Sequence, residues 1–146
     1  RFLGLDLDEW LVDIGEAAVL REGSDGAIIA YGALVQRAMT AADDLAEGGL
    51  EITVVNARFA KPLDIDTLKE VVSHHPAVLI AEDHVSPGGF GAGVLEALVR
   101  DGIPTDHVRL ATVPDRFIEH APRERQLARL GLDGAGLAKR LREMVE

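Results

Sequence analysis

The sequence predicts an α/β domain with three layers, in which helices cover both faces of a doubly wound, mostly parallel sheet. Continuous apolar runs at residues 27–31, 52–55 and 77–81 are typical of strands that are buried on both faces. Apolar residues at helical spacing follow each run, and the connections are short. Because right-handed crossovers build such an alternation, the carboxyl ends of the strands should share one edge, where ligands usually bind.

The chain before the first buried strand divides into two parts. Residues 1–15 mix leucine and phenylalanine with acidic residues without a sustained period, which predicts a lead-in or docking arm. The folded domain is then expected over 16–146. Residues 16–21 fit a short edge strand, and 22–26 are dense in turn-forming residues.

Helix and strand boundaries follow from capping residues and glycines. Gly48 and Gly49 end the first predicted helix, and Asp64 can cap the second. A fourth strand fits residues 107–111, and the tail over 123–146 predicts two helices separated by glycines. The inner face of the third helix is expected to consist of Val94, Leu95, Leu98 and Val99.

Composition narrows the classes of site and partner. The 146 residues include no cysteine, 15 basic and 25 acidic side chains, which give a net charge of −10. Without cysteine there is no thiol nucleophile or cysteine-based metal site, a usage compatible with the reducing cytoplasm. The negative field would repel nucleic acid and anionic membranes, and no apolar run is long enough to span a bilayer. We therefore expect a cytoplasmic protein with neither partner, and Arg1 as first residue predicts a processed chain or a fragment.

A glycine-rich loop after the third buried strand is a candidate for ligand binding. Gly88, Gly89 and Gly91 would let backbone N–H groups approach an anion at the start of the next helix. The loop matches neither the dinucleotide pattern G-x-G-x-x-G nor the phosphate-loop pattern G-x-x-x-x-G-K-[ST]. Two interpretations stay open: an anion site, or close packing of strand and helix, which we favour.

Glu82, Asp83 and His84 stand where this strand is expected to end. They could perform acid–base chemistry, but loop capping or pairing with an arginine is the stronger explanation for such residues, and we favour an interface. The histidines do not form the H-E-x-x-H pattern of a zinc site, and no serine lies in a G-x-S-x-G elbow. The sequence therefore assigns no catalytic or metal-binding residue.

The segment Pro-Asp-Arg-Phe-Ile-Glu-His at 114–120 gathers charges and large apolar groups in one predicted loop. Phe117 and Ile118, flanked by charges, fit a partly buried contact with another domain. Catalysis by Arg116 or His120 is the alternative, and we favour the contact because loops often anchor interfaces.

Three motifs in order along the chain resemble one family. They are Val-Val-Asn-Ala-Arg-Phe-Ala-Lys-Pro-Leu-Asp at 54–64, Glu-Asp-His through Gly-Gly-Phe-Gly at 82–91, and the segment 114–120. The chain resembles the C-terminal domain of the 1-deoxy-D-xylulose-5-phosphate synthases, in the transketolase superfamily. The Lys-Pro-Leu-Asp and Gly-Gly-Phe-Gly elements are similar to the wider superfamily, including 2-oxo acid dehydrogenase β subunits, whereas 114–120 points to the synthase.

This resemblance implies a five-stranded sheet with one antiparallel edge strand, which 16–21 would form, and a part in dimer packing. It also implies a full-length enzyme that condenses pyruvate with glyceraldehyde 3-phosphate and releases CO2, for isoprenoid, thiamine and pyridoxal synthesis. In that family thiamine diphosphate and Mg²⁺ lie between two upstream domains. The resemblance therefore implies that this chain holds no cofactor or catalytic residue and is inactive alone.

The resemblance also directs attention to the loops on one rim of the sheet. We expect contacts with the upstream domains or within a homodimer at Arg58, Lys61, Asp64, Glu82, His84, Phe90, Arg116, Phe117, Glu119 and His120. Two rival interpretations stay open. One is a free-standing anion- or nucleotide-binding module that uses the glycine loop, and the other is the C-terminal domain of a different thiamine-dependent enzyme, such as a dehydrogenase β subunit or a transketolase.

Overall fold

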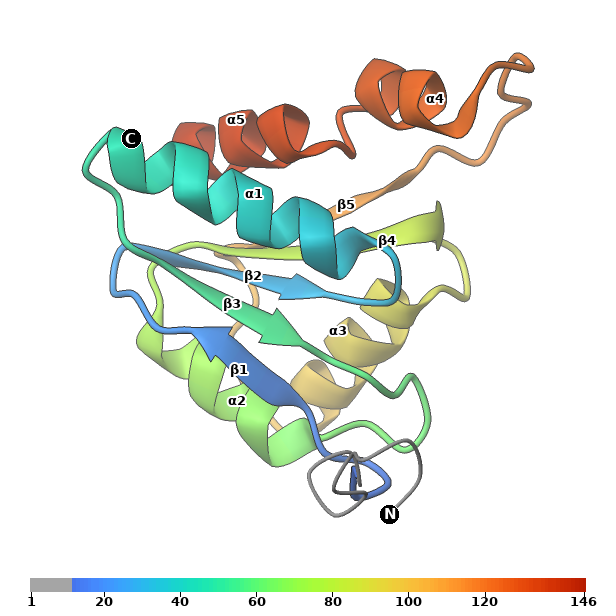
Figure 1. Ribbon diagram of the computed structural model, residues 1–146. Coiled ribbons are helices and arrows are strands. Elements are labelled where there is room, and N and C mark those ends of the chain that lie inside the picture. Colours follow the sequence, from blue (N-terminus) through green and yellow to red (C-terminus); the bar gives the residue numbers. More distant parts are fainter. Residues whose placement is uncertain (1–11) are drawn as a thin grey trace, which may run out of the picture.

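Five strands form one mixed sheet in the computed structural model, which describes residues 12–146 (Figure 1). They are β1 (Ala18–Arg21), β2 (Gly26–Ala30), β3 (Ile52–Asn56), β4 (Val78–Val85) and β5 (Val108–Val113). The spatial order is β1-β3-β2-β4-β5, and every neighbouring pair is parallel except the antiparallel pair β1 and β3. The predicted sheet, with its one antiparallel edge strand, is confirmed.

Five helices within residues 12–146 form the two outer layers. They are α1 (Leu34–Glu47), α2 (Ile65–His74), α3 (Phe90–Arg100), α4 (Arg123–Leu130) and α5 (Gly134–Val145). Helices α1, α4 and α5 cover one face of the sheet, and α2 and α3 cover the other (Figure 1). Within the part of the chain that the structure describes, no helix is long and apolar enough to cross a membrane.

Strand register explains why the apolar runs are continuous rather than alternating. Ile28 on β2 pairs with Val54 on β3 and with Leu79 on β4, and all three side chains are buried beneath α1 and α5. The next residue along each strand faces α2 and α3 instead. Both faces of the central strands are therefore in the core, as expected for a parallel sheet between two helical layers.

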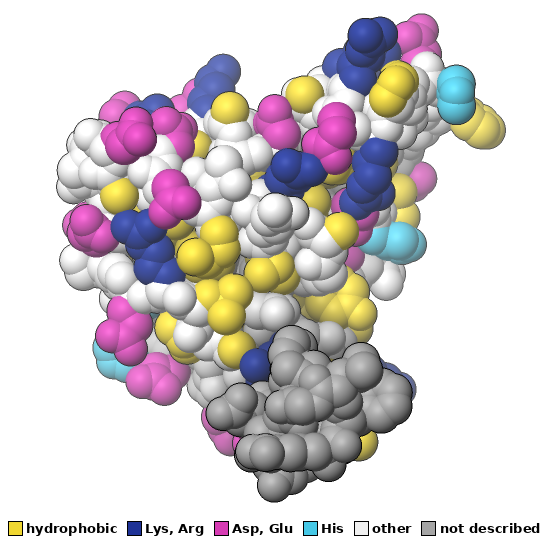
Figure 2. Space-filling view, in the orientation of Figure 1, with side chains coloured by type: hydrophobic (Ala, Val, Ile, Leu, Met, Phe, Trp, Pro, Cys, Tyr) yellow, Lys and Arg dark blue, Asp and Glu magenta, His cyan; other side chains and the backbone are white. Residues whose placement is uncertain are grey.

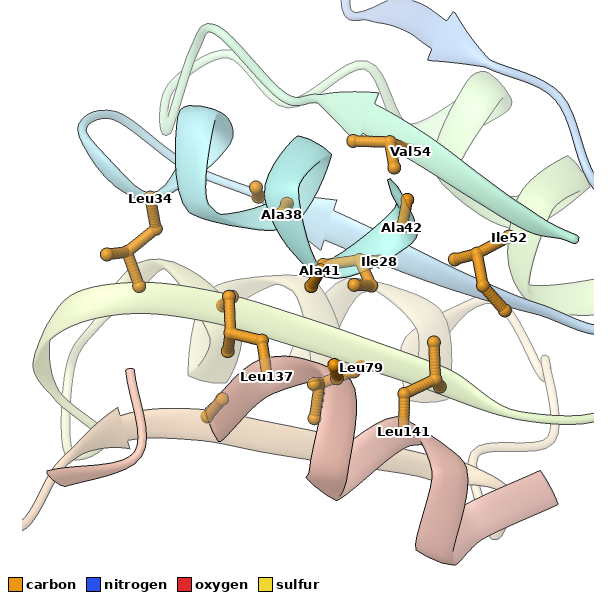
Figure 3. Close-up of a cluster of buried hydrophobic side chains, with 14 of the residues drawn as sticks. Ile28, Leu34, Ala38, Ala41, Ala42, Ile52, Val54, Leu79, Leu137 and Leu141 are labelled. Carbon is orange, nitrogen blue, oxygen red and sulfur yellow. The ribbon is translucent and has the colours of Figure 1, made fainter. Parts of the chain in front are cut away.

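The buried side chains form one cluster on each face of the sheet. The larger cluster lies between the sheet and the pair α1 and α5 (Figure 3). The inner face of α1 carries the small residues Ala38, Ala41 and Ala42, all fully buried. Where α1 meets α5, a Cβ on Gly134 would lie 2.8 Å from Thr40 Cγ2. Small side chains on both helices therefore allow α5 to pack directly beside α1.

Two features differ from the sequence prediction. Strand β4 continues through Val85 instead of ending at Ala81, because it pairs with β5 again at Val85 and Val113 after an irregularity. Val99, expected on the inner face of α3, is 63% exposed. It follows the buried Leu98, and each helical residue turns the side chain by about 100°, which takes Val99 out of the core. The predicted lead-in, 1–15, lies mostly outside the described residues.

Asp64 joins the edge strand to the helical layer. Its side chain caps α2 by accepting from Thr67 N at 3.1 Å and from Thr67 Oγ1 at 2.9 Å. It also accepts from Ala17 N, immediately before β1, at 2.8 Å. Burial raises the pKa of Asp64, but these three hydrogen bonds outweigh it and leave the pKa below the ordinary 3.8.

Replacing this cap should weaken the fold in a pH-dependent way. Asp64→Ala is expected to lower the free energy of unfolding by about 1–2 kcal/mol at neutral pH, since a cap and a β1 contact are both lost. Because the folded pKa is depressed, the stabilisation is present above pH 3.8 and should fade as the pH falls further toward the folded pKa. Urea unfolding across this pH range measures both effects.

The matched control is Asp44→Ala, which removes an exposed carboxylate with no hydrogen bond found within residues 12–146. Its effect should stay within about 0.5 kcal/mol at every pH. Equal losses for the two variants would contradict a capping role for Asp64.

Candidate functional site

The carboxyl ends of β2, β3, β4 and β5 share one rim of the sheet (Figure 1). After β2 the chain runs through α1 to β3 on one side, and after β4 it runs through α3 to β5 on the other. The crevice outside β2 and β4 is therefore the topological switch point, where ligands of open α/β sheets usually bind. The side chains in this crevice decide whether a ligand could bind there.

The side chain of Glu82 fills the ligand position at this switch point. It is 2% exposed, and its two oxygens accept from the first two backbone N–H groups of α3. Phe90 N donates to Oε2 at 2.8 Å and Gly91 N donates to Oε1 at 2.9 Å. A carboxylate at a helix N-terminus is stabilised both by these charge-assisted bonds and by the helix dipole. Glu82 thus occupies the place of an anionic ligand.

Two glycines make room for the Glu82 carboxylate. A Cβ on Gly89 would lie 2.5 Å from the carbonyl oxygen of Val85 and 2.6 Å from Glu82 Oε1. A Cβ on Gly91 would lie 2.8 Å from Leu110 Cδ2 and 3.3 Å from Glu82 Oε1. By contrast, Gly88 has open space around it and adopts a φ of 72°, which suits the turn. The loop's glycines serve close approach and chain reversal.

The N–H groups of this loop are engaged by the chain itself. Gly89 N donates to the carbonyl oxygen of Ser86 at 3.1 Å, and Phe90 and Gly91 donate to Glu82. An external anion at these three groups would have to displace a buried carboxylate. This geometry favours close packing of strand and helix over an anion site at Gly88, Gly89 and Gly91.

An aromatic pair closes the neighbouring part of the rim. Tyr31, directly after β2, stacks on Phe90, the first residue of α3, with ring centroids 4.9 Å apart and planes inclined by 14°. Such stacking adds about 0.5–1.5 kcal/mol beyond area burial. The sequence offered no signal for this pair beyond the presence of one aromatic residue after β2 and one at the start of α3.

Beyond β5 the rim continues as a projecting loop. We call residues 114–122 the arm; it begins at Pro114 and leads into α4 (Figure 1). Ile118 lines a hollow of about 140 Å³ together with Leu127 and Leu130. Gln126 Nε2 donates to the carbonyl oxygen of Glu119 at 3.0 Å. The base of the arm is therefore fixed to α4.

An ion pair connects the arm's helix to the end of β4. Arg123 on α4 contacts Asp83, and a hydrogen bond to that carboxylate raises the pKa of the guanidinium. The next residue of α4, Glu124, contacts Arg37 of α1 at 2.6 Å. The sequence anticipated that a carboxylate at this strand end could pair with an arginine, but it could not identify which arginine.

The ten residues expected to make interdomain contacts fall into two groups. Asp64, Glu82 and Phe90 make the contacts within the domain described above. The others are exposed on the rim and arm: Arg58, Lys61, His84, Arg116, Phe117, Glu119 and His120. Contacts with another domain stay a prediction for all ten residues. Arg58 also has a φ of 56°, held by its N–H bond to Asn56 Oδ1 at 3.0 Å.

A scan against family models matches residues 15–137 to the family described as transketolase, C-terminal domain. Since this match covers most of the chain, the chain belongs to the transketolase C-terminal domain family. A solved structure described as a split-gene transketolase, an inactive tetramer of beta subunits, superposes with a TM-score of 0.82 and 32% identity. That alignment covers 92% of this chain and 43% of the transketolase chain.

The most similar curated relatives include several 1-deoxy-D-xylulose-5-phosphate synthases. The chain is 42% identical to synthase 1 of Geobacter sulfurreducens over 137 residues, 92% of this chain and 22% of the relative. It is 45% identical to the synthase of Gloeobacter violaceus over 132 residues, 90% of this chain and 20% of the relative. The chain thus spans about a fifth of the length of the synthases that it matches.

Glycine 89 and glycine 93 provide a matched test of the packing around Glu82. Gly89→Ala should destabilise the domain by more than about 1 kcal/mol, because its Cβ would meet a backbone oxygen at 2.5 Å. Gly93→Ala, inside α3 with nothing within 4 Å, should instead stabilise it by about 0.5–1 kcal/mol. Thermal and urea unfolding of both variants measure these changes. If the loop tolerated a side chain at residue 89, the two variants would change the stability by similar amounts, and the close packing would be contradicted.

The carboxylate itself is tested by Glu82→Gln. The amide keeps one acceptor but sets an NH₂ group against a backbone N–H, so we expect a loss of about 2–3 kcal/mol in urea unfolding. The control is Glu96→Gln, an exposed position on α3, which should change the stability by less than about 0.5 kcal/mol. A neutral result at Glu82 would show that the two N–H bonds contribute little.

Proposed function

We propose that this chain is the C-terminal domain of a 1-deoxy-D-xylulose-5-phosphate synthase and acts there as a structural domain without catalytic residues. The observation that carries the proposal is the similarity to such synthases at 42–45% identity over 90–92% of the chain. The whole enzyme would condense pyruvate with glyceraldehyde 3-phosphate and release CO2. It would supply precursors for isoprenoids, thiamine and pyridoxal.

The described residues do not fit thiamine diphosphate or its Mg²⁺ ion. At the switch point the amide groups that could hold a diphosphate are bonded to Glu82 and Ser86. Within residues 12–146 no group of three histidine or acidic side chains is arranged to hold a metal ion. We therefore assign the cofactor and the chemistry to other parts of the full-length enzyme. We also propose that this enzyme acts in the cytoplasm.

The domain would have a structural role in the full-length enzyme. Seven exposed residues of the rim and arm, defined above, would contact the upstream domains or a second subunit of a homodimer. The buried cap at Glu82 and the stacked Tyr31 and Phe90 would hold the rim in one shape during those contacts. A rigid surface loses little conformational entropy on docking, which favours stable assembly.

Another thiamine-dependent enzyme is a weaker candidate. The split-gene transketolase is 32% identical to this chain, against 42–45% for the two synthases above. The segment 114–120 also resembles the synthases in particular. A free-standing anion-binding module is disfavoured because Glu82 already occupies the amides that such a module would use.

The proposal is tested with the full-length gene product and with this chain alone. With thiamine diphosphate and Mg²⁺, the full-length protein should form 1-deoxy-D-xylulose 5-phosphate from pyruvate and glyceraldehyde 3-phosphate. The isolated chain should form none and should not bind thiamine diphosphate in calorimetry.

Two controls sharpen this test. Transketolase substrates offered to the same full-length protein should give little turnover, which separates the synthase from the weaker candidate. Saturable binding of a nucleotide or inorganic phosphate by the isolated chain, together with an inactive full-length protein, would contradict the proposal and support a binding module.

A further inference from the structure

We propose that His75 is a pH-sensitive latch that holds the connection between β1 and β2 against the rest of the domain. The protonated ring would fix the carbonyl group of Gly23, and loss of the proton would turn the hydroxyl of Thr53 and release that carbonyl group. The inference goes beyond the proposed function and does not depend on it, since every group that it uses lies within this chain.

Both ring nitrogens of His75, the residue directly after α2, face oxygen atoms. Nδ1 lies 2.7 Å from the carbonyl oxygen of Val71, in the last turn of α2. Nε2 lies 3.0 Å from the carbonyl oxygen of Gly23, between β1 and β2, and 2.9 Å from the hydroxyl oxygen of Thr53 on β3. One partly buried side chain thus joins a helix end, a strand and the connection between two strands.

These positions match the protonated form of the ring. A neutral imidazole carries one N–H donor, whereas the protonated ring donates from both nitrogens and can serve both carbonyl groups. Thr53 Oγ1 accepts from Gly23 N at 3.0 Å and donates to the carbonyl oxygen of Gly23 at 2.8 Å. Because a hydroxyl has one hydrogen, Thr53 cannot donate to Nε2 of His75 while it donates to Gly23.

Loss of the proton would change the role of Nε2. If Nδ1 keeps its hydrogen for the last turn of α2, Nε2 becomes an acceptor that faces the hydroxyl of Thr53. That hydroxyl would then turn from Gly23 to the ring of His75. The carbonyl group of Gly23 would lose both of its donors, which weakens the attachment of this connection to β3 and α2.

The edge strand β1 depends on this attachment. It has four residues, and its register with β3 shifts between Val19 and Arg21. The connection that follows lies directly against β3, since a Cβ on Gly23 would be 2.4 Å from backbone atoms of Glu51 and Ile52. A short edge strand with irregular pairing opens at low free-energy cost, so release of Gly23 should reach β1 first.

The surroundings of the ring can accommodate a positive charge. His75 lines a hollow of about 180 Å³ between β1 and α2, whose other titratable side chains are Glu22, Glu70 and His74. From β1 and β3 come Val19 and Thr53, which carry no charge. Figure 2 shows a histidine beside acidic side chains at the lower left, the region where α2 ends in Figure 1. The negative end of the α2 dipole acts in the same sense.

Urea unfolding of this chain at about pH 5.5 and about pH 8.5, on either side of the usual histidine titration, tests the latch. The protonated ring makes one more hydrogen bond than the neutral ring, so its contribution should be complete at the lower pH and fade as the pH rises. His75→Gln should therefore reduce the folding equilibrium constant at least about tenfold more at the lower pH than at the higher.

The matched control is His74→Gln. In the part of the chain that the structure describes, His74 makes one such contact, between Nδ1 and the carbonyl oxygen of Glu70 at 2.7 Å, which a neutral ring can also make. Its loss should differ less than about threefold between the two pH values. Equal pH dependence for the two variants would overturn the latch.

A second measurement uses the unsubstituted chain and so does not require a variant to fold. In an NMR titration, Nε2 of His75 should lose its proton while Nδ1 keeps its own, and the amide and carbonyl signals of Gly23 should follow the same midpoint. Hydrogen exchange of the β1 amides, corrected for its intrinsic pH dependence, should accelerate at least about threefold across that midpoint. A Gly23 signal that does not follow the ring, or a ring that does not titrate, contradicts the inference.

Discussion

The buried carboxylate of Glu82 at the N-terminus of α3 is the interaction on which the rest of the rim depends. It joins β4 to the start of α3, and it requires glycine at two positions, Gly89 before α3 and Gly91 in its first turn. It places Phe90 against Tyr31, so the two strands on either side of the switch point are linked. Losing this carboxylate would leave two buried N–H groups without partners at the centre of the domain.

The same interaction explains why the helix N-terminus at the switch point is not an open anion site. In open α/β sheets a helix N-terminus at the switch point is a ready anion site. Here that geometry is kept, but a side chain of the domain supplies the negative charge. Because the anion is covalently part of the chain, its attraction to the helix contributes to folding instead of to affinity for a ligand.

Sequence patterns predicted the strands and helices well because parallel strands between two helical layers must be apolar on both faces. The run at 27–31 corresponds to β2 with a shift of one residue, and the run at 52–55 corresponds to β3, which extends one residue further. The role of Glu82 was not predictable, because its burial depends on β4 continuing past Ala81 beside β5. Such long-range pairing leaves no local signal in a Glu-Asp-His triplet, which is polar in composition.

The arm was predictable as a contact segment but not as a projection. Its charges and apolar residues indicate an interface wherever they lie, whereas exposure of Phe117 depends on how Ile118 and Gln126 fix the base against α4. The two sites then divide the work of one domain. Glu82 accepts from the two backbone N–H groups at the start of α3, so these two groups are not free to hold a small anionic ligand. The arm leaves the aromatic side chain of Phe117 exposed to solvent, and a macromolecular partner would be needed to bury it.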